Sequence, residues 1–308
     1  MIYNDYKFQI PKEKMIRVIT DTDAKNEADD QFAIVQAILS PRFDNVGFIA
    51  AHYGDRHPDS MLRSYLELEL IFEKMNLPSA GLLYKGNTCA LVSKDPPQIT
   101  EGAALIIREA LAVDDRPLFV IFFGPLTDLA AAYLIDPSIS GKLTAIWIGG
   151  GAYPSGGQEF NLGNDVLAAN IVFESGIDIW QVPKNVYEMM PVSLAELECR
   201  VAPHGEIGKY LLDQLVKHSF EEDPRKSDFR TGETWVLGDS PAVGLLLYEH
   251  RFAYKLYPPP FILDDLTYIH NIPERKNLRP IRVYQTIDSR LILEDLYCKL
   301  ELFAKKSR

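Results

Sequence analysis

Cysteine is scarce in this chain. Its 308 residues include three cysteines, Cys89, Cys199 and Cys298, which lie far apart and form no C-x-x-C pair. An odd and dispersed set of this kind is not a disulfide framework. It is typical of a reducing compartment in which the thiols are buried or inert.

Basic charge and long hydrophobic runs are also lacking. The 32 Lys and Arg residues are outnumbered by 43 Asp and Glu residues, which gives a net charge of −11. Nucleic acids and anionic membranes both require a basic face, so we expect neither as a partner. The most apolar long stretch, residues 117–135, contains Gly124, Pro125 and Asp128, and it predicts a strand, a turn and a helix rather than a membrane span. The mixed, charged first 14 residues do not resemble a secretory signal, so we expect a cytoplasmic protein.

The chain does contain a regular alternation of apolar strands and helices. Such an alternation is typical of an α/β fold with an open, mostly parallel sheet and helices on both faces. The predicted strands are 15–20, 46–51, 118–123, 143–148 and 177–182, and the predicted helices are 29–39, 60–75, 101–111, 126–135 and 166–174.

The pattern loosens after Pro183. Helices are predicted at 207–219 and 240–248, a charged loop at 220–232 and a strand at 281–284. No internal repeat or clear linker divides the chain. We therefore expect a single domain over residues 1–308, with an elaborated C-terminal part.

The loop after the first predicted strand is unusually acidic. Ligands of open α/β sheets bind beyond the carboxyl ends of the strands, and here five acids occur within residues 21–30. Asp29 and Asp30 suit the first turn of a helix, but Asp21 and Asp23 lie next to a buried strand. Two like charges this close repel by about 1–4 kcal/mol. A hard cation is the usual remedy, so the loop predicts a metal site.

Other strand ends carry weaker signals. Three glycines at 149–151 permit a close approach of the backbone to a ligand, although tight packing alone explains such a turn. Asp239 precedes a predicted helix, where a capping role is the plain alternative.

Taken in order, these motifs resemble the inosine–uridine preferring nucleoside hydrolases. The resemblance covers about residues 16–250 and implies a Rossmann-like nucleoside hydrolase fold. It implies a calcium-dependent N-ribohydrolase that cleaves a ribonucleoside into ribose and free base, and a homodimer or homotetramer. The motifs that carry it are Asp21-Thr22-Asp23 with Asp29-Asp30, Gly124-Pro125-Leu126-Thr127, Gly149-Gly150-Gly151, Glu159-Phe160-Asn161 and Gly238-Asp239.

The resemblance also implies a role for each matching residue. The calcium ligands would be the carboxylates of Asp23, Asp30 and Asp239 and the backbone carbonyl of Thr127. Asp23 would in addition take a proton from water bound at the calcium, on the way to a transition state with oxocarbenium character. The residues expected at the substrate are Asp29, Asp55, Ile148, Glu159, Asn161 and Trp235.

Four features depart from the family pattern. Gly238 stands where a histidine usually protonates the leaving base, and Asp55 stands for the usual asparagine. Two extra residues lie between Asp23 and Asp29, and the loop between Gly151 and Glu159 is short and lacks its usual asparagine. The residues that could stack on or protonate a base are His52, Tyr53, His57, Tyr187 and, first among them, Trp235, although packing also accounts for each.

Two alternatives stay open. Asp21-x-Asp23 after a strand, with the acidic pair in residues 261–265, resembles a haloacid dehalogenase-type phosphohydrolase with an aspartyl-phosphate intermediate. That scheme gives no role to Asp29-Asp30 or to the Gly-Pro-Leu-Thr motif. The replacement at Gly238 also suits a protein that binds ribose or a nucleoside without turnover. The sequence does not name the base.

Overall fold

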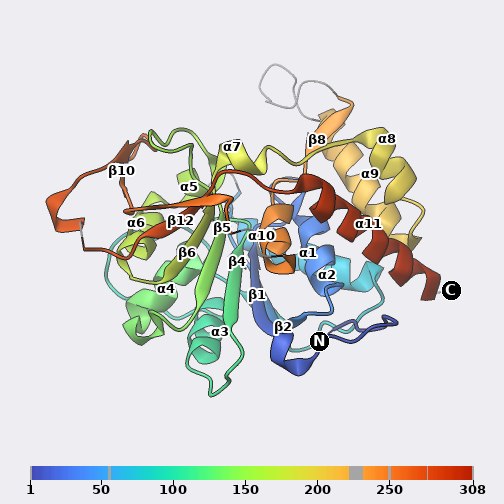
Figure 1. Ribbon diagram of the computed structural model, residues 1–308, viewed down its shortest axis with the longest axis horizontal. Helices are drawn as coiled ribbons and strands as arrows, with labels where there is room; N and C mark the ends of the chain where they lie inside the picture. The colour runs from blue at the N-terminus through green and yellow to red at the C-terminus, as the bar shows by residue number, and fades with distance from the viewer. Residues whose placement is uncertain (1, 55–56, 222–231, 249–250, 276, 307–308) are drawn as a thin grey trace.

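A single large sheet organises the molecule, as the computed structural model shows (Figure 1). The structure describes residues 2–54, 57–221, 232–248, 251–275 and 277–306. Eight strands lie in the order β3-β2-β1-β4-β5-β6-β12-β9, and all neighbours are parallel except β12 and β9. Their bounds are β1 Ile16–Thr22, β2 Phe43–Ala50, β3 Leu83–Lys85, β4 Leu118–Phe122, β5 Thr144–Ile148, β6 Asp178–Val182, β9 Tyr254–Tyr257 and β12 Ile281–Tyr284.

Helices cover both faces of this sheet (Figure 1). Successive strand residues point to opposite faces, so Val18 packs in the core beneath one helical layer and Ile19 in the core beneath the other. One layer contains α1 Asp30–Ile38, α2 Ser60–Lys74, α8 Leu194–Arg200, α9 Gly205–Glu221, α10 Ser240–Leu247 and α11 Ser289–Lys306. The other contains α3 Glu101–Ala110, α4 Thr127–Ile135 and α6 Val166–Glu174.

Short elements connect these layers. Helices α5 Phe160–Asn164 and α7 Lys184–Tyr187 follow β5 and β6, and single 3-10 turns lie at Lys12–Lys14, Pro137–Ile139 and Pro273–Arg275. Two small antiparallel pairs complete the C-terminal part: β7 Pro191–Ser193 with β8 Thr234–Val236, and β10 Phe261–Ile262 with β11 Tyr268–Ile269.

The predicted open, mostly parallel sheet is confirmed, with two kinds of difference. Strand β1 continues to Thr22, so Asp21 belongs to the buried strand and not to the loop after it. Helix α11 was not predicted, although Ile292, Leu296, Leu300 and Phe303 form its buried stripe at helical spacing. Strands β3 and β9 were also missed, because short and half-exposed strands at a sheet edge have no continuous apolar run.

Helix α11 packs against the two helices that carry the acidic motifs. The side-chain amide of Gln36 in α1 donates to the carbonyl of Ile292 at 2.9 Å. In α10, a Cβ on Gly244 would lie 2.4 Å from Ile292 Cδ1, so only glycine permits this close helix contact. The buried Lys299 ammonium completes the contact by donating to Ser40 Oγ at 2.8 Å.

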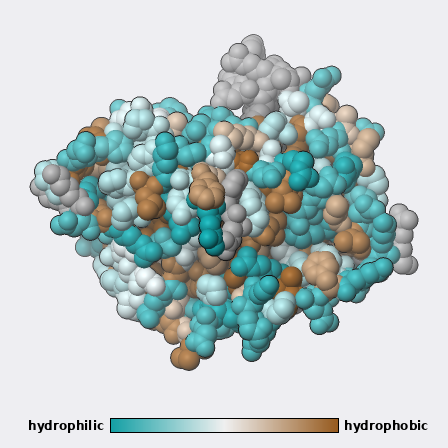
Figure 2. Space-filling model, in the orientation of Figure 1, coloured by the Kyte–Doolittle hydropathy of each residue, from teal (hydrophilic) through white to brown (hydrophobic). Residues whose placement is uncertain are grey.

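The surface contradicts one expectation about the thiols. All three cysteines are free and exposed, so of the expected alternatives, buried or inert thiols, burial is wrong. Hydrophilic residues cover most of the face seen in Figure 2, with hydrophobic ones between them in small groups. Within the described part of the chain, no helix has both the length and the apolar character needed to cross a membrane.

The strand order reverses between β1 and β4. The chain builds the sheet outward from β1 through β2 to β3, then returns to the other side of β1 with β4, β5 and β6. Ligands of open α/β sheets bind at such a switch point, beyond the carboxyl ends of the strands. Asp23 follows β1 here and Phe123 follows β4, which places both at this edge.

Candidate active site

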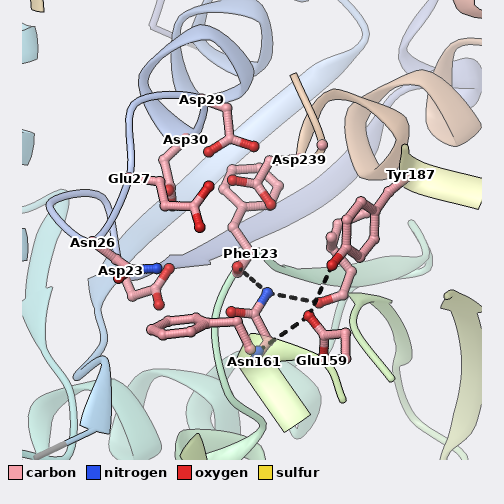
Figure 3. Close-up of a pocket in the computed structure, with 13 residues that line it drawn as sticks. Asp23, Asn26, Glu27, Asp29, Asp30, Phe123, Glu159, Asn161, Tyr187 and Asp239 are labelled. Carbon is pink, nitrogen blue, oxygen red and sulfur yellow. Dashed lines mark hydrogen bonds between the residues drawn. The ribbon is translucent and has the colours of Figure 1, made fainter. Parts of the chain in front are cut away.

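A cavity lies at the switch point, at the end of the sheet where β1, β4 and β5 terminate (Figure 3). The N-terminal ends of α1, α5 and α10 also face it, so three helices present their amide ends to the same space. The lining residues are Asp23, Asn26, Glu27, Asp29, Asp30, Phe123, Ile148, Glu159, Phe160, Asn161, Tyr187, Gly238 and Asp239.

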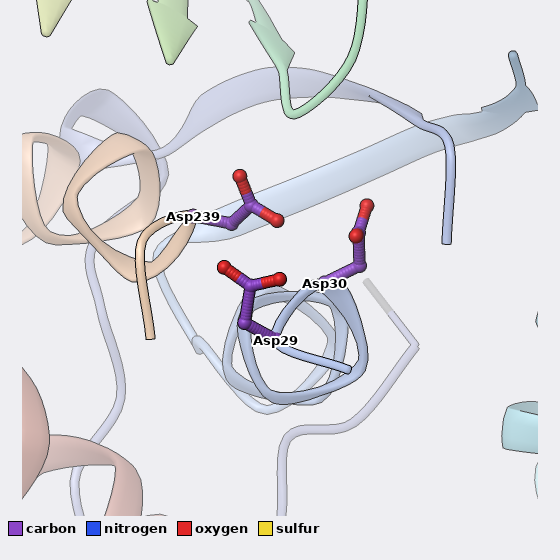
Figure 4. Close-up of side chains that lie close together, drawn as sticks. All are labelled: Asp29, Asp30 and Asp239. Carbon is purple, nitrogen blue, oxygen red and sulfur yellow. The ribbon is translucent and has the colours of Figure 1, made fainter. Parts of the chain in front are cut away.

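Three carboxylates meet at the centre of this site. Asp29 and Asp239 occupy the N-cap positions of α1 and α10 without a side-chain capping hydrogen bond, and Asp30 is the first residue of α1. One carboxylate oxygen from each lies within 4.8 Å of the others, and Figure 4 shows the three groups pointing toward one another. The partial positive charge at a helix N-terminus favours an acid at each position, but it does not remove the repulsion among the three.

Burial raises the pKa values of all three acids, and neighbouring charges add to the shift for Asp30 and Asp239. Burial raises the pKa of Asp30 to about 8, with a further contribution from the Asp29 charge and an opposing one from the Thr22 hydroxyl, which donates at 2.5 Å. Burial raises the pKa of Asp29 to about 6, although backbone amides, including that of Gly238, oppose the shift. The pKa of Asp239 is raised well above its ordinary value by burial and then by the charges of Asp29 and Asp30.

Asp23 extends the cluster from the opposite wall. It is 1% exposed and follows β1 directly, and burial followed by the Asp30 charge raises its pKa. Its Oδ2 is buried without a hydrogen-bond partner among the described residues. A Cβ on Gly124 would lie 3.0 Å from Asp23 Cγ, so the glycine after β4 permits the acid to stand at the cavity wall.

This donor set fits a hard divalent cation. All four acids offer oxygen, three of them converge within 4.8 Å, and the fourth has an oxygen that no described donor satisfies. Calcium and magnesium take carboxylate oxygens of this kind, whereas zinc sites in proteins draw mainly on cysteine and histidine.

Thr127 lies at the first position of α4, buried beside the cavity and not among the residues that line it. Its hydroxyl donates to Asp165 Oδ2 at 2.8 Å, and His52 Nε2 lies 2.9 Å from the same hydroxyl. These side-chain contacts fix the first turn of α4 and leave the backbone carbonyl as the only group that Thr127 has for a ligand role.

Glu159 and Asn161 line another part of the cavity, at the N-terminal end of α5. Glu159 caps α5 and accepts hydrogen bonds from the amides of Gly150 at 2.7 Å, Asn161 at 3.1 Å and Leu162 at 2.8 Å. Its Oε1 also accepts from the Tyr187 hydroxyl at 3.2 Å. Burial raises the pKa of Glu159, and these four donors oppose the shift. The Glu159 carboxylate is therefore held in one orientation.

The Asn161 side chain joins two strand ends. Its Nδ2 donates to the carbonyl of Phe123 after β4 at 2.6 Å and to that of Ile148 at the end of β5 at 2.9 Å (Figure 3). Because the amide nitrogen is committed to the backbone, the side-chain oxygen is the group turned toward the cavity.

Tyr187 and Gly238 share one corner. A Cβ on Gly238 would lie 3.1 Å from Tyr187 Cδ2 and 3.3 Å from Asp29 Oδ2. The tyrosine ring thus lies against the place that a longer side chain at 238 would need. The two residues are complementary in size.

Comparisons with known proteins agree with this geometry. Residues 18–288 match the family model described as inosine-uridine preferring nucleoside hydrolase. The chain belongs to this family. Its members are hydrolases that act on N-glycosyl bonds, so the phosphohydrolase and non-enzymatic alternatives are set aside.

One curated relative is similar to this chain in sequence, and two solved structures are similar to it in fold. The chain is 29% identical to the pyrimidine-specific ribonucleoside hydrolase RihA of Salmonella arizonae over 229 residues, which cover 67% of this chain and 73% of that protein. Its fold is similar to a purine-preferring ribonucleoside hydrolase from Gardnerella vaginalis, with a TM-score of 0.71, 20% identity, and coverage of 94% and 99% of the two chains. An inosine-guanosine nucleoside hydrolase is also similar in fold, with a TM-score of 0.71, 16% identity, and coverage of 92% and 98%.

The predicted site residues fall into two groups. The structure brings Asp23, Asp29, Asp30, Ile148, Glu159, Asn161 and Asp239 to one cavity. Trp235 does not line it: the side chain is 1% exposed in the core and its ring centroid lies 5.4 Å from that of His218. The expectation that Trp235 faces a base is therefore wrong for this structure, because β8 turns the indole inward. Asp55 lies outside the described residues.

The other aromatic and histidine candidates also divide. His52 and Tyr53 are buried away from the cavity, and His57 is exposed and does not line it. Tyr187 does line it. The acidic pair Asp264 and Asp265, which suggested a phosphohydrolase, is exposed after β10 and does not line the cavity with Asp23.

Four lining residues were not predicted as site residues: Asn26, Glu27, Phe123 and Phe160. Phe123 and Phe160 lie at positions that the motifs already bracket, one after β4 and one between Glu159 and Asn161. Asn26 and Glu27 lie in the stretch that is two residues longer than the family pattern. The extra length was itself the signal for them, since an insertion beside a cavity adds new side chains to its wall.

Proposed function

We propose that this chain is a calcium-dependent N-ribohydrolase that cleaves the C1′–N bond of a ribonucleoside to give ribose and the free base. The observation that carries the proposal is the oxygen of Asp23 without a described hydrogen-bond partner, at the wall of a cavity where Asp29, Asp30 and Asp239 converge. In a family of N-glycosyl hydrolases, a site of this composition serves a divalent cation and a sugar together.

The proposed ligands are Asp23, Asp30, Asp239 and the carbonyl of Thr127. Calcium, when bound, supplies positive charge that orients sugar hydroxyls and makes water a stronger acid. Asp23 then takes the proton of the attacking water, and its unpaired oxygen is free to do so. The remaining carboxylates favour the positive charge that develops on the sugar as the bond to the base breaks.

The other cavity residues hold the substrate in this scheme. Asp29 and the fixed carboxylate of Glu159 accept from ribose hydroxyls, and Asn161 offers its side-chain oxygen. Ile148 supplies an apolar contact at the end of β5. Each of these groups is held by the backbone around it, which suits orientation of the sugar before reaction.

Release of reducing sugar tests the proposal directly. Uridine, cytidine, inosine and adenosine are incubated with the protein in calcium, in excess chelator, and after calcium is restored. We expect ribose release in calcium, its loss in chelator and its return on restoration. Full activity in excess chelator would contradict the metal site, and no ribose from any riboside in calcium would contradict the hydrolase.

Deoxyribonucleosides provide a second test of the same geometry. A sugar without its 2′-hydroxyl loses one contact in the site, and a lost contact of this kind typically costs about 10²–10³ in rate. We expect a fall in kcat/KM of that order for 2′-deoxyuridine against uridine. Equal values for the two sugars would contradict a role of the 2′-hydroxyl.

We also propose a cytoplasmic location and a homodimer or homotetramer. Light scattering of the purified protein measures the second point, and a monomer at micromolar concentration would contradict it. The relatives include a pyrimidine-specific and a purine-preferring enzyme, so the proposal covers ribonucleosides of both base classes.

A further inference from the structure

One buried acid outside the cavity joins three segments of the chain. Glu67 lies in the middle of α2 and is 3% exposed. Its Oε2 accepts from the Lys25 ammonium at 2.8 Å, and its Oε1 accepts from the Gln31 side-chain amide at 3.0 Å and from the Tyr210 hydroxyl of α9. Both oxygens are satisfied, so the burial of this carboxylate needs no ligand.

Two partners of Glu67 adjoin the cavity acids. Lys25 lies two residues after Asp23, in the loop that follows β1. Gln31 directly follows Asp30 in α1. Glu67 does not line the cavity itself. It therefore holds the chain immediately beyond two of the proposed calcium ligands without reaching the site.

The loop between these acids, residues 24–28, is fixed at both of its ends. At the first end, the side-chain nitrogen of Gln31 donates to the Ala24 carbonyl at 2.5 Å as well as to the acid in α2. At the other end, the side-chain amide of Gln214 in α9 donates to the Ala28 carbonyl at 2.8 Å. Both alanines are fully buried, so each anchor lies inside the protein.

Between the two anchors, Asn26 and Glu27 line the cavity (Figure 3). Their stretch is two residues longer than the family pattern, and a longer loop loses more conformational freedom when it becomes ordered. The backbone amides of Lys25 and Asn26 both donate to the Asp23 carbonyl, at 2.6 and 2.8 Å. Displacement of the loop would therefore move Asp23 with it.

Resting on the hydrolase function proposed above, we propose that Glu67 is a positioning residue. Through Lys25 and Gln31 it holds the loop after β1 in the geometry that the calcium site and the attacking water require, and Gln214 holds the other end of the same loop. Such positioning matters for rate, because a displacement of about 1 Å at a reacting group can cost about 10²-fold.

Glu67→Gln tests this role with the shape of the side chain preserved. One accepting oxygen becomes an NH2 group that faces donors, so part of the first anchor is lost. We expect kcat/KM for ribonucleosides to fall about 10–10²-fold and the calcium Kd to rise about tenfold. Amide hydrogen exchange across residues 24–28 needs neither metal nor substrate, and we expect it to become about tenfold faster.

Asp295→Asn is the matched control, because Asp295 in α11 has the same kinds of partner. Its Oδ2 accepts from the Lys299 ammonium at 2.6 Å and from the side-chain amide of Gln36, also in α1, at 2.9 Å. These hydrogen bonds join α1 to α11. We expect this variant to lower Tm, as Glu67→Gln does, and to keep kcat/KM, the calcium Kd and exchange in residues 24–28 within about twofold of the wild type.

Two further variants test the same loop if Glu67→Gln does not fold. Gln214→Met removes the anchor at Ala28 from a half-buried position, and it is expected to speed exchange in residues 24–28 and to lower kcat/KM about tenfold. Lys25→Met removes the ion pair. Added to Glu67→Gln it is expected to cause no further loss, because the pair is already broken. Additive losses would contradict action through Lys25.

The outcomes separate this proposal from the function on which it rests. If the wild-type protein cleaves no riboside, the hydrolase function fails, whereas faster exchange and weaker calcium binding in Glu67→Gln would still support the positioning role. Unchanged exchange in both Glu67→Gln and Gln214→Met would overturn that role. So would faster exchange with kcat/KM and the calcium Kd at wild-type values, because Glu67 would then serve only stability. An equal loss of kcat/KM in Asp295→Asn would overturn it as well.

Discussion

Two groups of buried acids lie side by side in this fold and differ in what surrounds them. Asp23, Asp29, Asp30 and Asp239 face a cavity and one another. Asp128 and Asp165 do not line that cavity, and each accepts hydrogen bonds from several donors, although Asp128 Oδ2 has no partner among the described residues. Asp128 Oδ1 accepts from the Asn87 amide at 2.9 Å, from its side chain at 2.9 Å and from the Thr100 hydroxyl at 3.3 Å.

Asp165, the second acid outside the cavity, is also held by hydrogen-bond donors. Asp165 caps α6 by accepting from the Ala168 amide at 2.8 Å, and its other oxygen accepts from the Leu91 amide at 2.9 Å and the Thr127 hydroxyl. Donors of this kind offset the cost of a buried carboxylate. Burial alone therefore does not mark a functional acid. The first group differs in that its members line one cavity together and that an oxygen of Asp23 there has no described donor.

Among the cavity acids, Asp23→Asn is expected to have the largest effect on activity. The substitution keeps the shape of the side chain and removes the group that accepts a proton from water, so we expect kcat/KM to fall about 10³-fold or more. Asp213→Asn, exposed on α9, is the control for loss of one charge. Steady-state kinetics with a saturating metal supply measures both. Activity near that of the control in Asp23→Asn would place the proton acceptor elsewhere.

The second prediction concerns pH and the cavity acids without metal. The pKa of Asp30 is raised from its ordinary value of 3.8 to about 8 in the folded protein, so between these pH values the folded state holds a proton that the unfolded state has lost. Stability of the metal-free protein must then fall as pH rises from about 4 to 8. Calcium competes with that proton, so we expect it to raise Tm more at pH 8 than at pH 5. Thermal melts at both pH values, with and without calcium, check this, and an equal shift would contradict it.

Asp165→Asn is expected to do the reverse of a cavity substitution. It replaces one accepting oxygen by an amide NH2 that faces groups that already donate, which costs about 1–3 kcal/mol of unfolding free energy. Calcium affinity, measured by titration calorimetry, should stay within about threefold. A large loss of calcium affinity at unchanged stability would show that Asp165 contributes to the metal site.

Tyr187→Phe is expected to have the smallest effect. It tests Glu159, an acid that lines the cavity and also accepts four hydrogen bonds. The variant removes one of its four hydrogen bonds, worth about 0.5–1.5 kcal/mol. We expect kcat/KM to fall between about twofold and tenfold. A fall beyond a hundredfold would give the hydroxyl a direct part in the reaction.

The sequence predicted the part of the site that depends on local pattern. Asp23, Asp30 and Asp239 follow strands or begin helices, and parallel strands bring their carboxyl ends to one edge. The family resemblance predicted Glu159 and Asn161. They follow strand β5, whose carboxyl end lies at the same edge of the sheet. The order of elements along the chain predicted the edge of the sheet at which the site lies, and the resemblance supplied the role of each residue.

The features that the sequence did not place depend on contacts between distant segments. Trp235 is an aromatic residue near Asp239 in sequence, but the pairing of β8 with β7 decides which way its ring turns. Gly238 and Tyr187 lie far apart in the sequence, and no local pattern shows that the tyrosine ring packs against the glycine. Glu27 was one acid among five in its loop, and only the path of that loop separates it from Asp29 and Asp30.

The position of helix α11 at the C-terminal end of the described chain affects when it can pack on α1 and α10. It contributes no residue to the cavity, yet it packs on α1 and α10, the two helices whose first turns present Asp29, Asp30 and Asp239. During synthesis it leaves the ribosome after every residue of the cavity has emerged. The nascent chain therefore carries all of its acidic motifs before the support that brings them together exists. Docking of α11 onto α1 and α10 therefore follows the emergence of every acidic motif.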